Sequence, residues 1–288
     1  MIELSYEMLN GKKYNGTSKP FGATIGGVDY IVKPNRAGTY SATCECMAQD
    51  LYKELGINTA EVELAEYICT KMALVKEIEL GEKNFISKGD AKVYMCEDVI
   101  SNIEALCTER SLEFNQEEIK EELYRIAIAD FLYMNFDRKT SSLMLTAEDG
   151  RVHIGRVIDN EGIYNCGYIN QDYIELRDNG GIEYGAYLLS RTVHQWMRIL
   201  DTRGCSHIGD ISERILRNNI SRREANKILE MGIDAIACNI LNSTEKAGCK
   251  EELAEMMLVA TISRMMTLQG MDVNDTVWKV KYEIKKFI

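Results

Sequence analysis

The placement of proline is the feature that most restricts how this chain can fold. Its two prolines, Pro20 and Pro34, both lie in the first 34 residues, and glycines are dense before Gly38. Because proline interrupts helices and glycine favours turns, this first part should consist of short strands and turns. The rest of the chain has no proline and can form long helices. The sequence therefore predicts a small turn-rich part followed by a larger helical one.

Composition and charge exclude several classes of protein. Apolar residues make up 45% of the 288 and charged residues 27%, which is ordinary for a globular protein with a full core. The net charge of −11 disfavours direct binding to nucleic acid or to an anionic membrane, because both need a basic face. No run approaches the roughly 20 apolar residues of a membrane span. The N-terminus does not resemble a signal peptide, and the nine scattered cysteines lack zinc-site spacing, so we expect a cytoplasmic protein with reduced thiols.

The first 80 residues predict a mixed sheet with one helix. Residues 21–25 and 29–33 read as a hairpin turned by Gly26-Gly27. Residues 39–56 read as a helix, with Thr39 or Ser41 as its N-cap and Gly56 as its stop. Residues 61–69 and 72–78 should form two further strands around Thr70-Lys71.

Later segments predict helices and one short hairpin. Residues 117–134 have apolar side chains at helical spacing along one face. Residues 143–145 and 151–154 read as a hairpin, and the remaining predicted helices cover 182–200, 222–242, 250–268 and 274–286. The basic segment 279–286 should belong to a packed terminal helix. The predicted fold class is α+β, a single unit over 1–288 with two lobes: a small mixed β-sheet N-lobe over about 1–80 and a larger, mostly helical C-lobe over about 81–288.

Four charged residues occur in an informative order. Lys33 ends a strand-like segment, Glu45 lies in the helix that follows, and Asp137 and Asp159 each come just after an apolar run. Kinases use lysine, glutamate and two aspartates in this order to hold ATP and magnesium. Lys33 would contact the phosphates and Glu45 would hold that lysine. Asp137 would orient the acceptor hydroxyl, and Asp159 would bind the metal.

Two further segments fit this interpretation. Asn15, Gly16, Ser18 and Lys19 form a small-residue loop whose N–H groups could approach phosphate, although the loop is not a Walker A sequence. Arg138, next to Asp137, is more suited to tying the catalytic loop in place by charge-assisted hydrogen bonds.

With these motifs in place, the chain resembles the HipA-like serine/threonine kinases, and among them the short forms related to the cell-translocating kinase. The resemblance rests on Tyr30 to Pro34 as a "Y-x-x-K-P" strand and on Glu45 ten residues before Leu55-Gly56. It also rests on a hinge-like strand that includes Lys76, Glu77 and Ile78, on Asn135 to Arg138 as the start of "N-x-D-R-H-x-x-N", and on Ile158-Asp159-Asn160 with Gly162 as "F-D-N-G".

The resemblance implies a two-lobed fold shared distantly with protein and lipid kinases. It implies ATP with Mg²⁺ or Mn²⁺, serine or threonine as acceptor in an unknown protein substrate, and nucleotide contacts from residues 76–78. Longer members of the family pair with an antitoxin, so an antitoxin-like regulator is a candidate partner. Members also phosphorylate a serine of their own phosphate loop, which makes Thr17 and Ser18 candidates for autophosphorylation.

Three departures leave two functions open. Lys139 replaces the histidine of the catalytic motif, Ser142 replaces its metal-binding asparagine, and Glu161 interrupts the Asp-Asn-Gly sequence. A hydroxyl is a poorer magnesium ligand than an amide oxygen, so Ser142 would be a weak ligand that Asn160 would have to assist. The first function is a HipA-like serine/threonine kinase with reduced activity. The alternative is a nucleotide-binding pseudokinase that acts as a regulatory or interaction protein.

Overall fold

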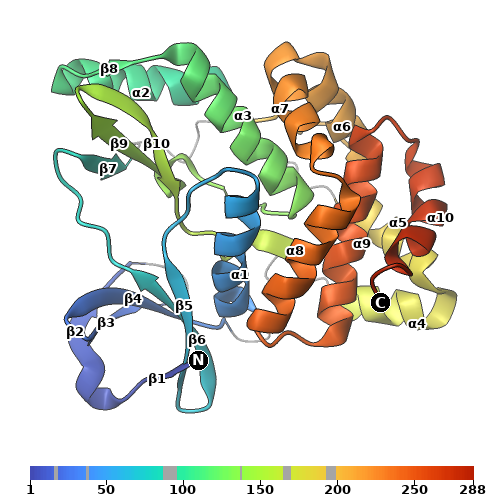
Figure 1. Cartoon of the computed structure of the whole chain (residues 1–288), viewed down its shortest axis with the longest axis horizontal. Coiled ribbons are helices and arrows are strands. Elements are labelled where there is room, and N and C mark those ends of the chain that lie inside the picture. The colour runs from blue at the N-terminus through green and yellow to red at the C-terminus, as the bar shows by residue number, and fades with distance from the viewer. Residues whose placement is uncertain (16–18, 37–38, 87–95, 137, 165–169, 193–198) are drawn as a thin grey trace.

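The computed structural model describes residues 1–15, 19–36, 39–86, 96–136, 138–164, 170–192 and 199–288. A twisted sheet from the N-terminal part lies at one end of the molecule, and most helices lie at the other (Figure 1). Helix α1 lies between them and contacts strands β5 and β6 of the sheet as well as helix α8. The predicted α+β class, with a small sheet region followed by a larger helical part, is confirmed.

The N-terminal sheet has six strands in the order β1-β5-β6-β4-β3-β2. All neighbours pair antiparallel except β1 and β5, which are parallel. The two strands of the predicted first hairpin are β3 and β4, whereas β1 and β2 were not predicted. The strands are β1 (Ile2–Glu3), β2 (Leu9–Lys13), β3 (Phe21–Ile25), β4 (Val28–Pro34), β5 (Val62–Tyr67) and β6 (Thr70–Lys76).

Only one of these two hairpin turns in the sheet could be predicted from its residues. Gly26 and Gly27 both have positive φ, at 59° and 81°, so the predicted glycine turn is confirmed. The second turn is formed by Ile68 and Cys69, with φ of 48° and 58°. The predicted turn around Thr70-Lys71 is wrong, because Thr70 already pairs with Tyr67 in the ladder. Few side chains favour positive φ, and a β-branched one least of all, so Ile68-Cys69 carries no turn signal that could be recognised in advance.

Helix α1 (Ser41–Glu54) ends close to the predicted stop, where Gly56 has φ of 72°. Its predicted cap is wrong: the N-cap residue is Tyr40, whose side chain makes no capping bond, and Ser41 is already helical. The amide of Ala42 donates instead to Asn35 Oδ1 at 2.8 Å. A side chain six residues before the helix thus satisfies an amide that a local cap would normally bind.

A second, four-stranded sheet lies among the helices in the order β7-β9-β10-β8. The predicted hairpin at 143–154 is confirmed and is longer than expected, because β9 and β10 pair along their whole length around Asp149-Gly150. The short strands β7 and β8 were not predicted. The strands are β7 (Asn84–Ile86), β8 (Glu113–Phe114), β9 (Leu143–Glu148) and β10 (Arg151–Val157).

The helices surround one large hydrophobic core that continues from α1 to the C-terminus. Helix α3 confirms the predicted helix at 117–134 but ends two residues earlier, at Leu132, and its N-cap is Asn115, whose side chain accepts from two backbone amides. Helix α9 lies at the centre of the bundle with almost all its side chains buried. The helices after α1 are α2 (Cys96–Arg110), α3 (Gln116–Leu132), α4 (Asn170–Gly180), α5 (Ile182–Arg191), α6 (Ile208–Arg217), α7 (Asn219–Glu230), α8 (Ile233–Lys246), α9 (Glu251–Leu268) and α10 (Val273–Ile284).

Two predicted helices have different bounds. The segment 222–242 was predicted as one helix, but it divides into α7 and α8 at Gly232, whose φ is 84°. The segment 182–200 was predicted as one helix, but α5 ends at Arg191, and residues 193–198 lie outside the described part. The apolar spacing continues past Arg191 and past Gly232, so periodicity alone did not predict that the helices end there.

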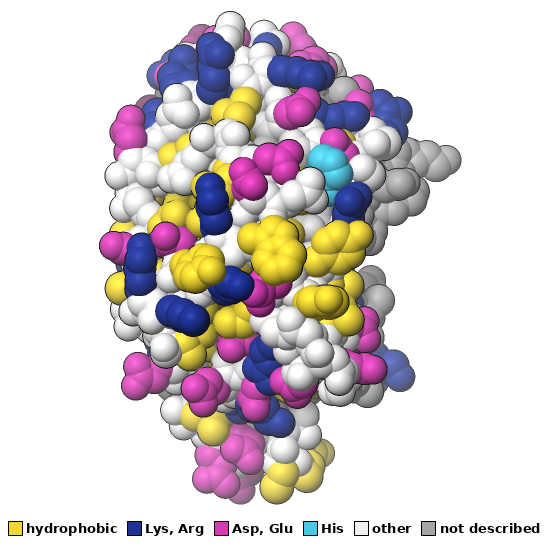
Figure 2. All heavy atoms as spheres, turned by 90° about the vertical axis from the view of Figure 1, so that its right-hand side faces the viewer, with side chains coloured by type: hydrophobic (Ala, Val, Ile, Leu, Met, Phe, Trp, Pro, Cys, Tyr) yellow, Lys and Arg dark blue, Asp and Glu magenta, His cyan; other side chains and the backbone are white. Residues whose placement is uncertain are grey.

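The C-terminal helix α10 packs as predicted, with Val273, Val277 and Val280 buried against α5 and α9. Its outer side exposes Trp278, which lines a surface pocket with Tyr184 and Tyr187 of α5, and it also exposes Tyr282. Hydrophobic side chains gather among lysines and arginines on this face (Figure 2). Within the described part of the chain, no helix is long and apolar enough to cross a membrane.

The break between α7 and α8 gives a stability prediction. Gly232→Ala should lower the free energy of unfolding by about 1–2 kcal/mol, because its φ of 84° strains any side chain although the space around it is open. The matched control is Gly81→Ala, which also meets nothing within 4 Å but has no positive φ, and should change stability by less than about 0.5 kcal/mol. Urea unfolding followed by circular dichroism measures both. Equal effects of the two variants would contradict the strained backbone at Gly232.

Candidate functional site

Lys33 lies near the end of β4, a strand paired on both sides by β3 and β6. Its side chain is 13% exposed and its ammonium reaches two carboxylates. The Nζ atom lies 2.8 Å from Asp159 Oδ1 and 3.3 Å from Glu45 Oε2. The structure therefore joins three of the four charged residues predicted from the sequence, although Lys33 and Asp159 are 126 positions apart. Asp137, the fourth, lies outside the described residues.

Glu45 is the fifth residue of α1 and is 1% exposed. One of its carboxylate oxygens accepts from Lys33. The other, Oε1, has no hydrogen-bond partner among the described residues. A buried carboxylate oxygen without a partner is costly and calls for a reason specific to its site.

Asp159 is positioned by the end of β10. The amide of Val157 donates to Asn58 O at 2.8 Å, and the amide of Ala60 donates to Val157 O at 3.3 Å. These bonds attach the end of β10 to the segment that follows α1. Asp159 itself has φ of 61°, a left-handed conformation that aspartate tolerates better than most residues. Such backbone strain often occurs at functional sites.

The charges of the site fix its protonation state. Burial alone would lower the pKa of the Lys33 ammonium, but the carboxylates of Glu45 and Asp159 outweigh it, and the pKa lies above its ordinary value. Burial would raise the pKa of the Asp159 carboxyl, but Lys33, with further effects of Lys139 and Arg138, holds that pKa below its ordinary value. At neutral pH the lysine is therefore an ammonium and the aspartate a carboxylate.

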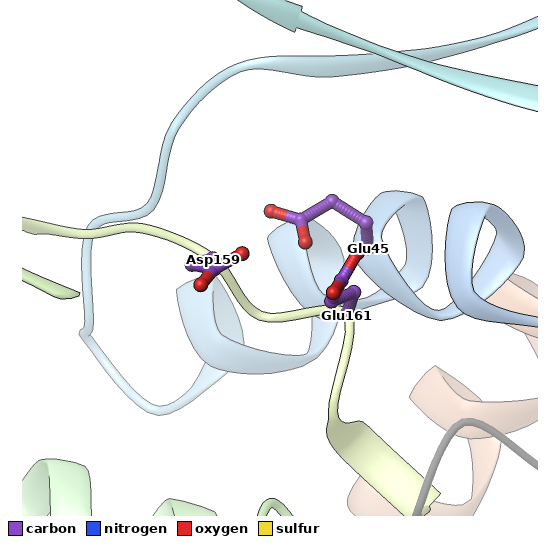
Figure 3. Close-up of side chains that lie close together, drawn as sticks. All are labelled: Glu45, Asp159 and Glu161. Atoms are coloured by element: carbon purple, nitrogen blue, oxygen red, sulfur yellow. The ribbon is translucent and has the colours of Figure 1, made fainter. Parts of the chain in front are cut away.

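A third carboxylate joins this group. Glu161 is almost fully buried and forms an ion pair with Arg36, which lies shortly after β4. Single carboxylate oxygens of Glu45, Asp159 and Glu161 all lie within 4.8 Å of one another. Figure 3 shows Glu45 extending from α1 towards Asp159, with Glu161 next to it on the same segment as Asp159. Hard oxygen ligands of this kind suit Mg²⁺ or Mn²⁺.

Arg138 ties the elements around the site together. Its guanidinium binds both oxygens of Asp130 in α3, with Nε–Oδ2 at 3.0 Å and Nη2–Oδ1 at 2.9 Å. It also donates to Ile158 O at 3.1 Å and to Asn160 Oδ1 at 2.7 Å, on either side of Asp159. Arg138 is 8% exposed, and its acceptors, foremost Asp130, raise its pKa further despite burial. These contacts support the predicted tying role.

Tyr52 of α1 extends the same network. Its hydroxyl donates to Asp130 Oδ1 and accepts from Asn135 Nδ2 at 3.1 Å. Arg138 Nη2 donates to that hydroxyl at 3.3 Å. Helix α1, which carries Glu45, is thereby connected to α3 and to the segment of Asp159.

The other predicted metal ligands lie close by. Ser142 is buried, and its carbonyl accepts from the amide of Ile158 at 2.9 Å, next to Asp159. The amide side chain of Asn160 accepts from Arg138 and donates to Val157 O at 3.2 Å, so both its ends already have partners.

The predicted nucleotide-binding residues divide into two groups. Lys76 pairs with Glu61 at 2.8 Å on the surface, and Glu77 accepts from Lys12 at 2.9 Å, so neither side chain is part of the Lys33 group. Ile78 packs with Ile31 and Ile158 on a small cluster that contains Ala73, next to Lys33 in the sheet.

The predicted phosphate loop connects β2 to β3. The amide of Tyr14 donates to Pro20 O at 3.1 Å and closes the loop at its base. Asn15 and Lys19 flank it and are exposed, and Lys19 has φ of 51°. Gly16, Thr17 and Ser18 lie outside the described residues.

Reasoning from the sequence missed part of the site. Asp130, Tyr52 and Arg36 were not singled out. An aspartate inside an apolar helix, eight residues before an arginine, is the one signal that could have revealed the pair. The partners of Tyr52 and Arg36 lie too far along the chain for any local pattern to show them.

No protein-family model matches the sequence, and no curated protein matches it either. Solved structures do match its fold. A Helicobacter pylori proinflammatory kinase, CtkA, aligns over 99% of both chains with a TM-score of 0.68 and 14% identity. The chain has the fold of a HipA-like kinase.

HipA itself, solved in a complex of a Shewanella oneidensis MR-1 toxin-antitoxin system with HipB and operator DNA, is a second match. It aligns over 94% of this chain and 70% of its own length, with a TM-score of 0.52 and 13% identity. The two matches confirm at the level of the fold the HipA-like resemblance seen in the motifs, and with it the two-lobed kinase-like fold class.

The network around Arg138 gives a second prediction. Tyr52→Phe should lower the free energy of unfolding by about 1–3 kcal/mol, because it removes the buried hydrogen bonds that the hydroxyl makes with Asp130 and Asn135. Tyr30→Phe is the matched control, since the Tyr30 hydroxyl makes a single weak bond of 3.4 Å to Glu63 and should matter by less than about 0.5 kcal/mol. Urea unfolding measures both, and equal small effects would show that the Tyr52 hydroxyl does not support this part of the HipA-like fold.

The lowered pKa of Asp159 gives a pH prediction. A carboxyl with a lowered folded-state pKa stabilises the protein above its unfolded-state pKa of about 4, and this contribution is lost as the pH falls through the folded-state pKa. Asp159→Asn should therefore be less stable than the parent at pH 6, and the difference should shrink on acidification below about pH 4. Unfolding free energies between pH 6 and 3 measure it. The control is Asp149→Asn, another aspartate at positive φ but in an exposed hairpin turn. A difference from the parent that stays constant with pH would contradict the Lys33–Asp159 ion pair.

Proposed function

We propose that this chain is an ATP-dependent protein kinase of HipA-like type that phosphorylates serine or threonine hydroxyls, including its own. The observation that carries the proposal is the ammonium of Lys33 held between Glu45 and Asp159 at 3.3 and 2.8 Å. Strand, helix and loop each contribute one of these groups, in the order that phosphoryl transfer uses. The neighbouring kinases support a kinase-type function through their shared fold.

The nucleotide would lie along β4 and the loop before β3. Lys33 would bind the phosphates while Glu45 holds its orientation, and the loop of Asn15, Gly16, Ser18 and Lys19 would offer backbone N–H groups. The adenine would pack on the apolar cluster that includes Ile31, Ile78 and Ile158. Because the side chains of Lys76 and Glu77 pair elsewhere, segment 76–78 would contact the base through its main chain and Ile78.

The residues present fit a divalent cation. Asp159 would be the principal ligand, with Ser142 and Asn160 as weaker ones, and the unpartnered Glu45 Oε1 supports a bound positive charge at this place. Bound Mg²⁺ or Mn²⁺ neutralises the charge that develops on the phosphates. Asp137 would orient the acceptor hydroxyl and accept its proton. Arg138, which is bound to Asp130, would position the segment that carries Asp137.

The proposed unit is the whole of 1–288, with an N-lobe over about 1–80 and a C-lobe over about 81–288, acting in the cytoplasm. Thr17 and Ser18 are the first candidates for autophosphorylation. Because the HipA match was solved together with HipB, an antitoxin-like regulator is the kind of partner we propose to look for.

A second function has its own support. Lys139 and Ser142 stand where the family motif has histidine and a metal-binding asparagine. Loss of one well-placed charge-stabilising group typically costs about 10²–10³-fold in rate. A pseudokinase that binds nucleotide and signals by conformation would keep the Lys33 group while having lost transfer.

Incubation with γ-labelled ATP and Mg²⁺ or Mn²⁺ distinguishes these functions. The parent should gain phosphate by intact mass, and Asp137→Ala and Lys33→Met should each lower the rate at least about 100-fold. Lys53→Met, an exposed lysine on α1, is the matched control and should retain the parental rate. Peptide mapping should place the phosphate first at Thr17 or Ser18.

Nucleotide binding is measured in parallel as a thermal shift with ATP and metal. Asp159→Ala should abolish the metal-dependent part of this shift more completely than Asp137→Ala. A shift that depends on Lys33 without any phosphate transfer would establish the pseudokinase. If the parent shows neither phosphate transfer nor a thermal shift with ATP, both proposed functions are overturned.

A further inference from the structure

Three carboxylates and the two cations paired directly with them meet around the end of Lys33, and Lys139 and Arg138 add further coulombic effects on Asp159. Glu45, Asp159 and Glu161 contribute three negative charges, whereas Lys33 and Arg36 contribute two positive ones. All three carboxylates come within 4.8 Å of one another. Carboxylates this close repel one another unless cations separate them.

The unpartnered oxygen of Glu45 lies at the same place. Its side chain is 1% exposed, and Oε1 has no hydrogen-bond partner in the described part of the chain. In Figure 3 the Glu45 carboxylate points from α1 towards Asp159. A buried, unpartnered acceptor close to two other carboxylates can be satisfied by a cation placed among them.

We propose that Glu161, with Glu45 and Asp159, forms a divalent-cation site in this chain. The proposal rests on the proposed function and deepens it, because it gives Glu161 the task that the family motif gives to the residue at position 142. Glu161 is the residue that interrupts the Asp-Asn-Gly sequence. This insertion would supply a metal ligand in place of the asparagine that Ser142 replaces.

The geometry is compatible with a small hard cation. Magnesium–oxygen bonds are about 2.0–2.1 Å and calcium–oxygen bonds about 2.3–2.6 Å, so ligand atoms on opposite sides of such ions lie roughly 4–5 Å apart. The upper limit of 4.8 Å between the three carboxylate oxygens falls in this range. A cation could lie among these oxygens once Lys33 Nζ, which contacts two of the three carboxylates, has moved away.

Lys33 and Arg36 compete with the cation for the same oxygens. When the ammonium of Lys33 moves onto nucleotide phosphates, Asp159 and Glu45 lose a positive partner, and the site attracts a cation more strongly. Removal of Arg36 should act in the same direction through Glu161. Binding of nucleotide and binding of the cation are thereby coupled.

Titration of the full chain with Mn²⁺ alone, followed by electron paramagnetic resonance of the free ion, tests the site. Glu161→Gln should weaken Mn²⁺ binding at least tenfold, whereas Arg36→Gln should tighten it severalfold. Glu61→Gln is the matched control, because Glu61 also pairs with a cation, Lys76, but on the surface, and its removal should leave Mn²⁺ affinity unchanged.

The opposite signs of the two variants separate a ligand from a structural ion pair. If Glu161 only neutralises Arg36, both variants lower the thermal midpoint and leave Mn²⁺ affinity at the parental value, and the proposal is overturned. If either single variant fails to fold, the double variant Arg36→Gln/Glu161→Gln removes both charges and should bind Mn²⁺ at least tenfold more weakly than the parent. Parental affinity in the double variant also overturns the proposal.

Failure of the kinase function has a different signature. If the parent binds Mn²⁺ in a Glu161-dependent manner but shows neither an ATP-induced thermal shift nor phosphate transfer, the proposed cation site stands and the proposed kinase function is overturned. If the parent transfers phosphate but its metal affinity does not depend on Glu161, the kinase function stands and the proposed cation site is overturned. A parent that binds no Mn²⁺, with or without ATP, overturns the site directly.

Discussion

The buried ion pair between Arg138 and Asp130 is the interaction on which the candidate site depends. Three segments that are distant along the chain meet at this guanidinium: α3 through Asp130, α1 through Tyr52, and the end of β10 through Ile158 and Asn160. Replacement of one partner would leave the other charged and buried, which typically costs about 3–5 kcal/mol. Since Glu45 is on α1 and Asp159 lies between Ile158 and Asn160, the same network fixes the distance between these carboxylates.

The local charges explain why a chain with a net charge of −11 can still hold a polyanion. Each carboxylate near Lys33 is paired with a cation, so nucleotide phosphates would meet an ammonium whose present partners are replaceable. Moving Lys33 from the carboxylates to the phosphates costs little free energy if a divalent cation binds the carboxylates at the same time. Net charge therefore governs nonspecific binding, whereas this site depends on a few groups within about 5 Å.

The sequence predicted the fold best where local chemistry decides it. The Gly26-Gly27 turn, the α3 helix with its polar start, and the packed α10 helix all have signals within a few residues. The Tyr40 cap, the Ile68-Cys69 turn and the break at Gly232 were not predicted, because distant partners or the surrounding packing determine them. In the site, the order of the charged residues along the chain brought Lys33, Glu45 and Asp159 forward, and the family resemblance then agreed with them. The pairs Arg36–Glu161 and Tyr52–Asp130 escaped, because pairing across about 80 or more residues leaves no periodic trace.

Several local costs to stability coincide at one place in this structure. Asp159 is held at positive φ, Glu45 Oε1 is buried without a partner, and two ion pairs are largely removed from water. Apolar residues of similar volume would often stabilise a fold as well as such buried pairs do, or better. A chain selected only for packing has no physical reason to keep these features together. Their concentration where β4, α1 and the end of β10 meet is the arrangement expected when a site binds charged ligands that balance its carboxylates.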